Sequence, residues 1–319
     1  MEYEKCESFF AGILAFMRTF ASNKPYNLFI MSKTFISLLA LVCAAVFVSC
    51  EEKKEPELAL TWASMNVRLD TPDDSMKNWM YRRDTMANFI KAQDLDIVGM
   101  QEVLYNQLTD LSERLPEYSH VGVGREDGAT QGEHMCIFFK KDKFDVLDSN
   151  TFWLSQYPDS IGFVGWDGAC PRVATWAKLK DKETGKVFMA VNTHFDHIGV
   201  EARHNGALLI MERIKDIVGD QPAVLTGDFN ITDDDPAYDT LTNSEFVLKD
   251  SHKIAEQVEG QAYTFHDYNR DAVEDRVKID FIFVTPTVKV HRSFIPVQAE
   301  GLEGPFISDH NPVIVDITF

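Results

Sequence analysis

Several segments that read as buried strands finish in polar, ionisable residues. In "NTHFDH", residues 192–197, an apolar run ends in His and Asp, and in "LTGDFN", residues 225–230, another ends in Asp and Asn. A single acid or histidine at a strand end is usually a turn or cap residue. The same format recurs, however, at Asn66, Glu102, His194 and Asp228 with Asn230, and two more sites belong with them: Asp280 within "KIDFIFV" and Asp309-His310 in "SDHNPV". Carboxylates bind hard divalent cations and histidine exchanges protons near neutral pH, so converging strand ends of this kind would form a metal-assisted acid–base site.

The order of these residues, N…QEV…NTH…GDFN…KIDFIFV…SDHNPV, resembles the endonuclease/exonuclease/phosphatase superfamily, which has the deoxyribonuclease-I-like fold. The resemblance extends over nearly all of residues 58–319, and "GDFN" and "SDHNPV" at their spacing are specific to it. It implies a metal-dependent phosphoester hydrolase that uses an activated water. Such a reaction needs a water in line with the leaving oxygen and a cation that neutralises the non-bridging oxygens.

The resemblance assigns metal ligands. Glu102 is expected to be the principal ligand, with Asn66 beside it and Asp309 either in the coordination sphere or directly behind it. Oxygen ligands of this kind suit Mg²⁺, with Mn²⁺ as the alternative ion. Mechanisms with one ion and with two use the same residues, so the number of ions stays open.

The resemblance also implies catalytic roles. Asp228 is expected to orient or deprotonate the attacking water, and Asn230 to donate a hydrogen bond to the phosphate. His310 is expected to act as the base or as a phosphate contact, oriented by Asp280, because an adjacent carboxylate fixes the tautomer and favours imidazolium. His194 is expected to stabilise the transition state or to protonate the leaving group.

Three further residues are candidates for substrate binding. Arg172 follows a loop rich in Gly and Trp, where many relatives have an arginine that faces the phosphate; the alternative is a surface salt bridge. Arg203 begins the helix after "NTHFDHIG" and is expected to contact the substrate. His197, with Asp196, either widens the site or lines its rim. Glu133 either orients His194 or caps a strand.

The segments that carry these residues alternate between strand-like and helix-like patterns. Helical spacing is found in residues 78–93, 106–115 and 201–218, the last with an apolar stripe that includes Ala207, Leu208 and Ile210. The polar turn "DKETG", residues 181–185, joins two strand patterns as a hairpin. The α/β pattern therefore predicts a four-layer sandwich, in which two packed, mostly antiparallel β-sheets are flanked by helices.

The N-terminal 57 residues differ from the rest. Residues 1–30 read as an upstream, mis-assigned start, and residues 31–50 as a signal peptide with Lys33 before a short apolar run. Ser49-Cys50 resembles a bacterial lipoprotein cleavage site, which implies lipid on Cys50, a tether over residues 51–57 and a domain over 58–319. The expected location is the cell envelope, as an outer-membrane lipoprotein on the periplasmic face or the cell surface. Ordinary secretion and an uncleaved anchor are the alternatives.

Two cysteines fall within the predicted domain. Cys136 and Cys170 are compatible with one disulfide in an oxidising compartment and equally with two buried thiols. Their spacing does not fit a metal site of the cysteine type.

Net charge narrows the class of substrate. Without residues 1–50 the chain keeps 27 of its 31 Lys and Arg residues and 47 of its 50 Asp and Glu residues, a formal charge of −20. Such a surface repels polyanions, which disfavours tight nucleic-acid binding and favours a small phosphorylated sugar, lipid or nucleotide. We expect a monomeric phosphodiesterase or phosphatase. The alternatives are a nuclease that acts on DNA or RNA, a non-catalytic ligand-binding module, and a membrane-active enzyme resembling sphingomyelinase.

Overall fold

The computed structural model describes residues 56–243, 248–298 and 305–319. The predicted leader and signal peptide, the lipid site Cys50 and most of the tether therefore lie outside the described residues. Residues 56–319 form one compact unit. Within the described ranges, every helix is too short or too polar to cross a bilayer.

The first sheet contains the chain's first described strand at its centre. Its seven strands have the order β10-β12-β13-β1-β2-β4-β3. Their bounds are β1 Ala59–Asn66, β2 Ile97–Gln101, β3 Tyr118–Val121, β4 Ile137–Lys140, β10 Gln257–Gly260, β12 Lys289–Ile295 and β13 Val313–Thr318. The pairs β1–β2 and β10–β12 are parallel and the others antiparallel.

The second sheet has the predicted hairpin near one edge. Its six strands have the order β5-β6-β7-β8-β11-β9. Their bounds are β5 Phe144–Trp153, β6 Val173–Asp181, β7 Val187–His194, β8 Ala223–Asp228, β9 Lys249–Asp250 and β11 Asp280–Val284. Only β7–β8 is parallel among these described pairs, so the prediction of mostly antiparallel sheets is confirmed.

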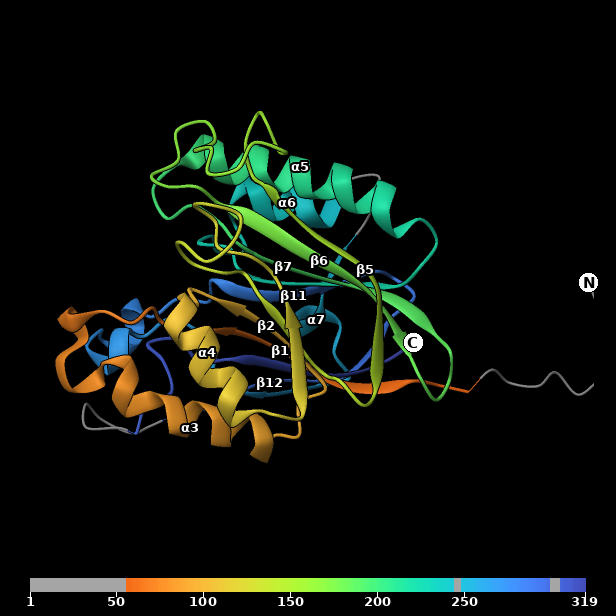
Figure 1. Cartoon of the computed structure of the whole chain (residues 1–319), viewed down its shortest axis with the longest axis horizontal. Helices are drawn as coiled ribbons and strands as arrows, with labels where there is room; N and C mark the ends of the chain where they lie inside the picture. Colours follow the sequence, from red (N-terminus) through yellow and green to blue (C-terminus); the bar gives the residue numbers. More distant parts are fainter. Residues whose placement is uncertain (1–55, 244–247, 299–304) are drawn as a thin grey trace, which may run out of the picture. The chain divides into compact units, whose positions relative to one another are not determined.

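Helices cover the outer face of each sheet (Figure 1). α3 (Trp79–Ala92) and α4 (Tyr105–Arg114) pack on the first sheet, whereas α5 (Val200–Val218) and α6 (Pro236–Asn243) pack on the second. A third apolar cluster fills the space between the sheets. This arrangement confirms the predicted four-layer α/β sandwich. The remaining elements are short: α7 Ser251–Ile254, η1 Pro72–Lys77, η2 Asp267–Asn269 and η3 Val273–Asp275.

β1 is apolar almost throughout because both of its faces are covered. Leu60 and Trp62 point into the cluster between the sheets, whereas Ala63 and Met65 point outward beneath α3 and α4. Successive side chains of a strand face opposite sides, so a central strand with both faces covered needs apolar residues at consecutive positions.

The two sheets approach each other closely at Gly99, in the middle of β2. A Cβ on Gly99 would lie 2.0 Å from Thr226 Oγ1, so only glycine fits there. Asn192 of β7 bridges this contact, because its Nδ2 donates to the carbonyls of Met100 (2.7 Å) and Cys136 (3.0 Å). Its Oδ1 accepts a hydrogen bond from Gln101 Nε2 at 2.6 Å. A buried polar network thus joins the sheets directly beneath the strand ends.

Two sequence-based expectations need refinement. Leu208 was placed on the buried stripe of α5, but it is 48% exposed, because it lies about 100° around the helix from buried Ala207. Cys136 is buried and Cys170 half-buried, and both are free thiols, which decides between the two alternatives for this pair.

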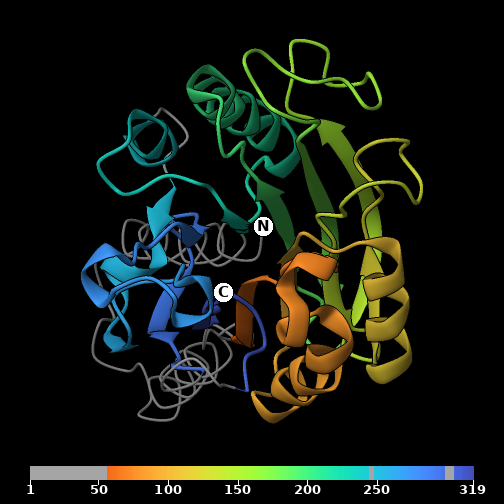
Figure 2. The same ribbon diagram turned by 90° about the vertical axis from the view of Figure 1, so that its left-hand side faces the viewer.

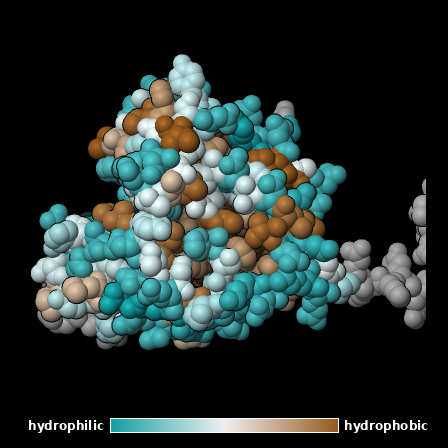
Figure 3. Space-filling model, in the orientation of Figure 1, coloured by the Kyte–Doolittle hydropathy of each residue, from teal (hydrophilic) through white to brown (hydrophobic). Residues whose placement is uncertain are grey.

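The surface of the domain is mostly hydrophilic on the face shown in Figure 3. Most of the face in Figure 3 is teal or white, with smaller brown areas between. Within the described residues, the exposed apolar side chains of one loop are Tyr157, Ile161, Phe163 and Val164, and Tyr157 packs edge-on against Phe163 at 5.1 Å.

Candidate functional site

Strand pairing in the second sheet places three of the candidate residues side by side. β7 and β8 are parallel and pair His194 with Asp228, the last residue of each strand. β11 runs antiparallel to β8, so its first residue, Asp280, pairs with Asp228 from the other side. One histidine and two aspartates therefore stand in a row at one end of this sheet.

The first sheet contributes its candidates at the same end. Asn66 is the last residue of β1, and Glu102 directly follows the last residue of the parallel strand β2. Asp309 and His310 precede β13, which is antiparallel to β1 and therefore begins where β1 ends. Figure 2 views this end, with the orange segment after β1 and the blue C-terminal segments on facing sides.

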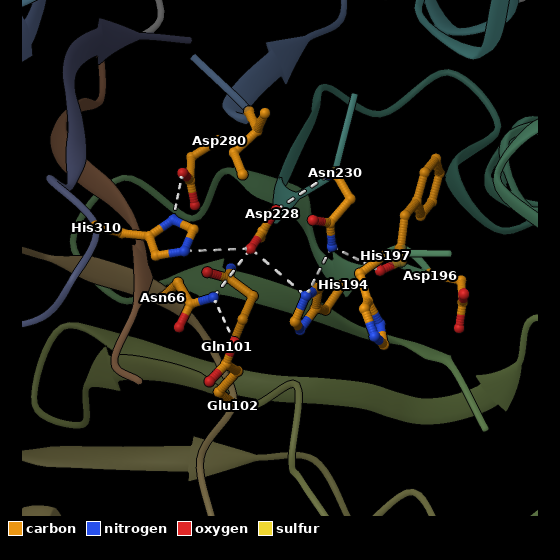
Figure 4. A network of polar contacts seen from close by, with 12 residues as sticks. Asn66, Gln101, Glu102, His194, Asp196, His197, Asp228, Asn230, Asp280 and His310 are labelled. Carbon is orange, nitrogen blue, oxygen red and sulfur yellow. Dashed lines mark hydrogen bonds and ion pairs between the residues drawn. The ribbon is translucent and has the colours of Figure 1, made fainter. Parts of the chain in front are cut away.

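Asp228 lies at the centre of the group (Figure 4). Its Oδ2 accepts a hydrogen bond from Asn66 Nδ2 at 2.9 Å and lies 3.4 Å from His194 Nε2 and 3.8 Å from His310 Nε2. Asn66 Nδ2 also donates to Glu102 Oε1 at 3.0 Å. Burial and the neighbouring Asp280 carboxylate raise the pKa of Asp228, which makes it a stronger base than an aspartate in water.

His310 and Asp280 form one buried pair. His310 Nδ1 donates to Asp280 Oδ2 at 2.8 Å. Burial alone would lower the pKa of His310, but the carboxylates of Asp280, Asp228 and Asp309 raise it well above 6.5. His310 is therefore an imidazolium at neutral pH. An imidazolium cannot accept a proton, so of the two roles predicted for His310 the geometry favours the phosphate contact.

His194 has the opposite protonation state. Burial and the positive charge of Arg172 lower its pKa to about 3, so its imidazole is neutral at neutral pH. Asn230 Nδ2 lies 3.1 Å from His194 Nε2, and Glu133 Oε2 lies 3.7 Å from His194 Nδ1. Glu133 is held by Arg125 Nη1 at 2.8 Å. A neutral His194 favours stabilisation of the transition state over protonation of the leaving group.

The carboxylates form a group suited to a hard cation. One ligand atom from each of Glu102, His194 and Asp228 lies within 4.8 Å of the others, and Asp228 forms a second such group with Asp280 and His310. Buried acids this close repel one another unless a cation compensates. The oxygen donors of Glu102 and Asp228 therefore fit Mg²⁺ or Mn²⁺.

The other two predicted ligands are arranged differently. Asn66 directs its amide nitrogen at the carboxylates, because its Oδ1 accepts a hydrogen bond from Arg68 N at 2.9 Å. Asp309 Oδ1 accepts from Ser308 Oγ at 3.1 Å, and its Oδ2 lies 3.7 Å from Arg68 Nε. Burial, opposed in part by His310, raises the pKa of Asp309 to about 6. Both residues border the acidic group, and their role as ligands stays a prediction.

Two of the candidate residues have an unfavourable backbone conformation. Glu102 and Asn230 have φ angles of 62° and 49°, in the left-handed region that side chains other than glycine seldom occupy. The backbone N–H of Leu69 fixes Glu102 by donating to Oε2 at 3.0 Å. Asn230 is fixed by its own N–H, which donates to Asp228 Oδ1 at 3.0 Å. Such strain persists where surrounding contacts over-determine a conformation, as they do here.

Arg172 belongs to a buried cluster beside His194. Its Nε donates to Asp196 Oδ2 at 3.3 Å, and its Nη2 lies 2.9 Å from His197 Nδ1. Its Nη1 is buried without a partner among the described atoms and borders a cavity of about 10 Å³, room for one water. The alternative of a surface salt bridge is wrong, because the Arg172–Asp196 pair is buried. Whether Arg172 also reaches the substrate stays a prediction.

The remaining substrate-binding candidates lie further from the centre. Arg203 Nη1 donates to the carbonyl of Asp196 at 3.0 Å, so its guanidinium fixes the segment after β7. His197 is exposed and contacts Arg172. Asp196 itself is buried, and backbone N–H groups of Gly199 and Ile198 outweigh burial to lower its pKa. The "FDH" part of the motif thus supports the rim, and direct substrate contact by Arg203 or His197 stays a prediction.

Sequence reasoning missed two supporting residues and one charged residue at the site. Gln101 and Asn192 form the network between the sheets, although both lie in the quoted motifs "QEV" and "NTH". Arg68 lies beside Asp309 and was not singled out. Its position two residues after Asn66, at the end of an apolar strand, is a signal of the kind that identified the other candidates.

Comparison with known proteins agrees with this geometry. A sequence model of the endonuclease/exonuclease/phosphatase family matches residues 63–310. A solved endonuclease/exonuclease/phosphatase from Bacteroides vulgatus is 58% identical, with a TM-score of 0.79, and the match covers 82% of this chain and 98% of that one. A mannosyl-6-phosphatase from Bacteroides thetaiotaomicron is 37% identical, with a TM-score of 0.77, and the match covers 82% of this chain and 100% of that one.

Curated relatives are more distant. An uncharacterised protein of Acanthamoeba polyphaga mimivirus is 29% identical over 251 residues, 76% of this chain and 92% of the viral protein. Nocturnin of Drosophila melanogaster is 25% identical over 193 residues, 55% of this chain and 28% of nocturnin.

Proposed function

The chain belongs to the endonuclease/exonuclease/phosphatase family, and we propose that it is a Mg²⁺-dependent hydrolase of small phosphorylated sugars. One observation carries the reaction type: Asp228 lies between an imidazolium, His310, and a neutral imidazole, His194, at the joined ends of both sheets. Support for the substrate class comes from the 37% identical mannosyl-6-phosphatase. Mn²⁺ is the alternative ion.

Asp228 is the residue that handles the attacking water. Its raised pKa makes it a competent acceptor of a proton, and Asn66 and Asn230 hold its two oxygens in place. A general base must lie within hydrogen-bond reach of the proton that it takes, and efficiency is highest when its pKa approaches the working pH.

The phosphate is held by donors on either side of Asp228. His310 contributes a charge-assisted N–H from Nε2, since Asp280 occupies its Nδ1. Asn230 would contribute Nδ2 by exchanging its contact with His194 Nε2, at 3.1 Å, for the phosphate, while it keeps its hydrogen bond to the carbonyl of Phe195 at 3.0 Å. These groups stabilise negative charge on the non-bridging oxygens as it grows in the transition state. When bound at Glu102, a divalent cation would supply further charge neutralisation at the phosphate.

Net charge favours a small substrate. The acidic surface repels long polyanions, which counts against a nuclease acting on DNA or RNA. The relation to nocturnin keeps nucleotides as the second candidate class.

We further propose that lipid on Cys50 anchors a monomeric protein in the outer membrane, on the periplasmic face or the cell surface. The motivation is the signal-like segment that ends in Ser49-Cys50. The wild type is expected to incorporate labelled palmitate in expressing cells, and Cys50→Ala is expected to incorporate none. If the wild type takes up no label, the lipid anchor is wrong.

A substrate panel tests the enzymatic proposal. The purified protein with Mg²⁺ is expected to release phosphate from mannose 6-phosphate and related sugar phosphates faster than from inositol phosphates, sphingomyelin, DNA or RNA.

His194→Ala should lower kcat by roughly 10²-fold without unfolding the protein, because it removes a transition-state contact. His204→Ala, which changes an exposed histidine of α5, is the matched control. Faster release from RNA or DNA would instead establish the nuclease alternative, and no release from any substrate would contradict the proposal.

A further inference from the structure

Arg68 is a charged residue at the edge of the acidic group that the proposed mechanism leaves unused. It follows β1 by two residues and has a φ of 58°, which turns the chain back beside the strand ends. Its Nε and Nη2 donate to Asp74 Oδ2 and Oδ1, each at 3.1 Å. Its Nε also lies 3.7 Å from Asp309 Oδ2. The guanidinium is therefore clamped along one edge by a carboxylate and adjoins a residue of the site.

Asp74 is itself fixed from behind. It is 3% exposed, and its Oδ2 accepts a hydrogen bond from Tyr268 Oη at 3.1 Å. Tyr268 is 1% exposed and lies in a turn of three consecutive left-handed residues, Asp267, Tyr268 and Asn269, with φ angles of 41°, 55° and 62°. A turn of this kind is costly for residues other than glycine, so its presence indicates that the position of Tyr268 is strongly determined by its surroundings. Arg68 is thus held by a rigid support.

A comparison with Arg82 shows what is unusual about Arg68. Arg82 is 2% exposed and uses its donors on four backbone carbonyls, including those of Val67 and Ile307, so its role is to join the two loops around the site. The Arg68 side chain is 29% exposed, and its Nη1 has no hydrogen bond to any of the described residues. Planar guanidinium geometry then leaves the edge that contains Nη1 available to a ligand.

We propose that Arg68 is a specificity-determining residue that donates from Nη1 to a non-bridging oxygen of a phosphomonoester dianion. This inference rests on the proposed function and selects the monoester within it. A monoester has three non-bridging oxygens and two negative charges, whereas a diester has two such oxygens and one charge. In the proposed function His310 and Asn230 bind two of these oxygens, so a fixed cation beside Asp309 matches the third. A diester would place an uncharged substituent there.

Arg68 provides a permanent charge at this position, because a guanidinium stays protonated at every pH at which proteins are folded. Arginine also presents two donors in fixed geometry, which suits phosphate better than the single ammonium of lysine.

Matched chromogenic substrates test the proposal. p-Nitrophenyl phosphate and bis(p-nitrophenyl) phosphate share a leaving group and differ in whether the third oxygen is free. Arg68→Gln is expected to lower kcat/KM for the monoester by roughly 10- to 100-fold, the range for one charge-assisted hydrogen bond, and for the diester by less than about threefold. Arg68→Lys should recover part of the loss. Arg83→Gln, which removes an arginine paired to Asp110 on the outer helices, is the control.

The outcomes separate the inference from the proposed function. An equal loss on both substrates would show that Arg68 only positions the metal-binding group, and no loss on either would show that it is a bystander; both overturn the inference. If the wild type hydrolyses neither substrate nor any sugar phosphate, the proposed function fails. Calorimetric binding of inorganic phosphate in Mg²⁺ still tests Arg68 in that case: weakening of about tenfold or more in Arg68→Gln supports the inference, and unchanged affinity overturns it.

Discussion

Replacing Asp228 by Asn is expected to lower kcat on the preferred substrate by about 10³- to 10⁴-fold while the protein remains folded. Asp228 Oδ2 is approached by Asn66, His194 and His310, within 2.9 to 3.8 Å. The amide of Asn cannot take a proton from water, and general-base catalysis of this kind contributes up to about 10⁴-fold. Hydrolysis measured at saturating substrate and Mg²⁺ gives the loss.

Two measurements make this result interpretable. Asp142→Asn changes an exposed aspartate in the turn between β4 and β5 and should leave kcat unchanged. Titration with Mn²⁺, followed by electron paramagnetic resonance, reports whether the Asp228 variant still binds a metal ion. Loss of activity with metal affinity retained assigns Asp228 to the water. A fall in kcat of less than about tenfold would remove Asp228 from the centre of the mechanism.

The strand ends could be predicted because each is a local pattern. In "AVLTGDFN" and "KVFMAVNTHF", residues 223–230 and 186–195, an apolar run ends abruptly in ionisable residues. The structure pairs His194 directly with Asp228, which follows once two such strands are parallel neighbours. Asp280 follows a different rule: it begins its strand, and reaches the site because β11 is antiparallel to β8. Asp280 could be assigned to the site from its position in the order of the motifs, but not from a strand pattern.

The supporting contacts could not be predicted because they depend on distant segments. Asn192 contacts carbonyls 92 and 56 residues away, and Arg82 contacts Ile307 O, 225 residues away. No local pattern specifies which buried amide crosses between two sheets. Arg68 shows the same limit, because its partner Asp74 is held by Tyr268, which is 194 residues away from Asp74 and lies in a left-handed turn. Local sequence thus predicts where ionisable groups gather, whereas their orientation and protonation state depend on tertiary packing.

Replacing Asp280 by Asn is expected to lower kcat by about 10²- to 10³-fold at pH 8 and to move the alkaline limb of the pH–rate profile to lower pH by about two to three units, because an adjacent opposite charge shifts a pKa by up to about three units. Burial lowers the pKa of His310, and the Asp280 carboxylate is foremost among the groups that outweigh burial and raise it. The protonated form of His310 therefore persists as the pH rises, and activity that needs it is lost only as the pH passes the raised pKa. With the carboxylate removed, burial remains, so the pKa of His310 falls and the imidazolium is lost at lower pH.

The alkaline limb separates this role of Asp280 from simple support of the fold. A carboxylate that only oriented the ring through its 2.8 Å hydrogen bond could be replaced by Asn with little change in kcat and no shift of the limb, because Asn can accept the same hydrogen bond. Nuclear magnetic resonance titration of His310 in the wild type and in Asp280→Asn, each with Mg²⁺, measures the pKa directly. If the limb and the pKa both stay in place, the charge of Asp280 does not hold the proton on His310, and the assignment of His310 as the cationic phosphate contact is wrong. If both move together, the proton on His310 is the one that catalysis needs.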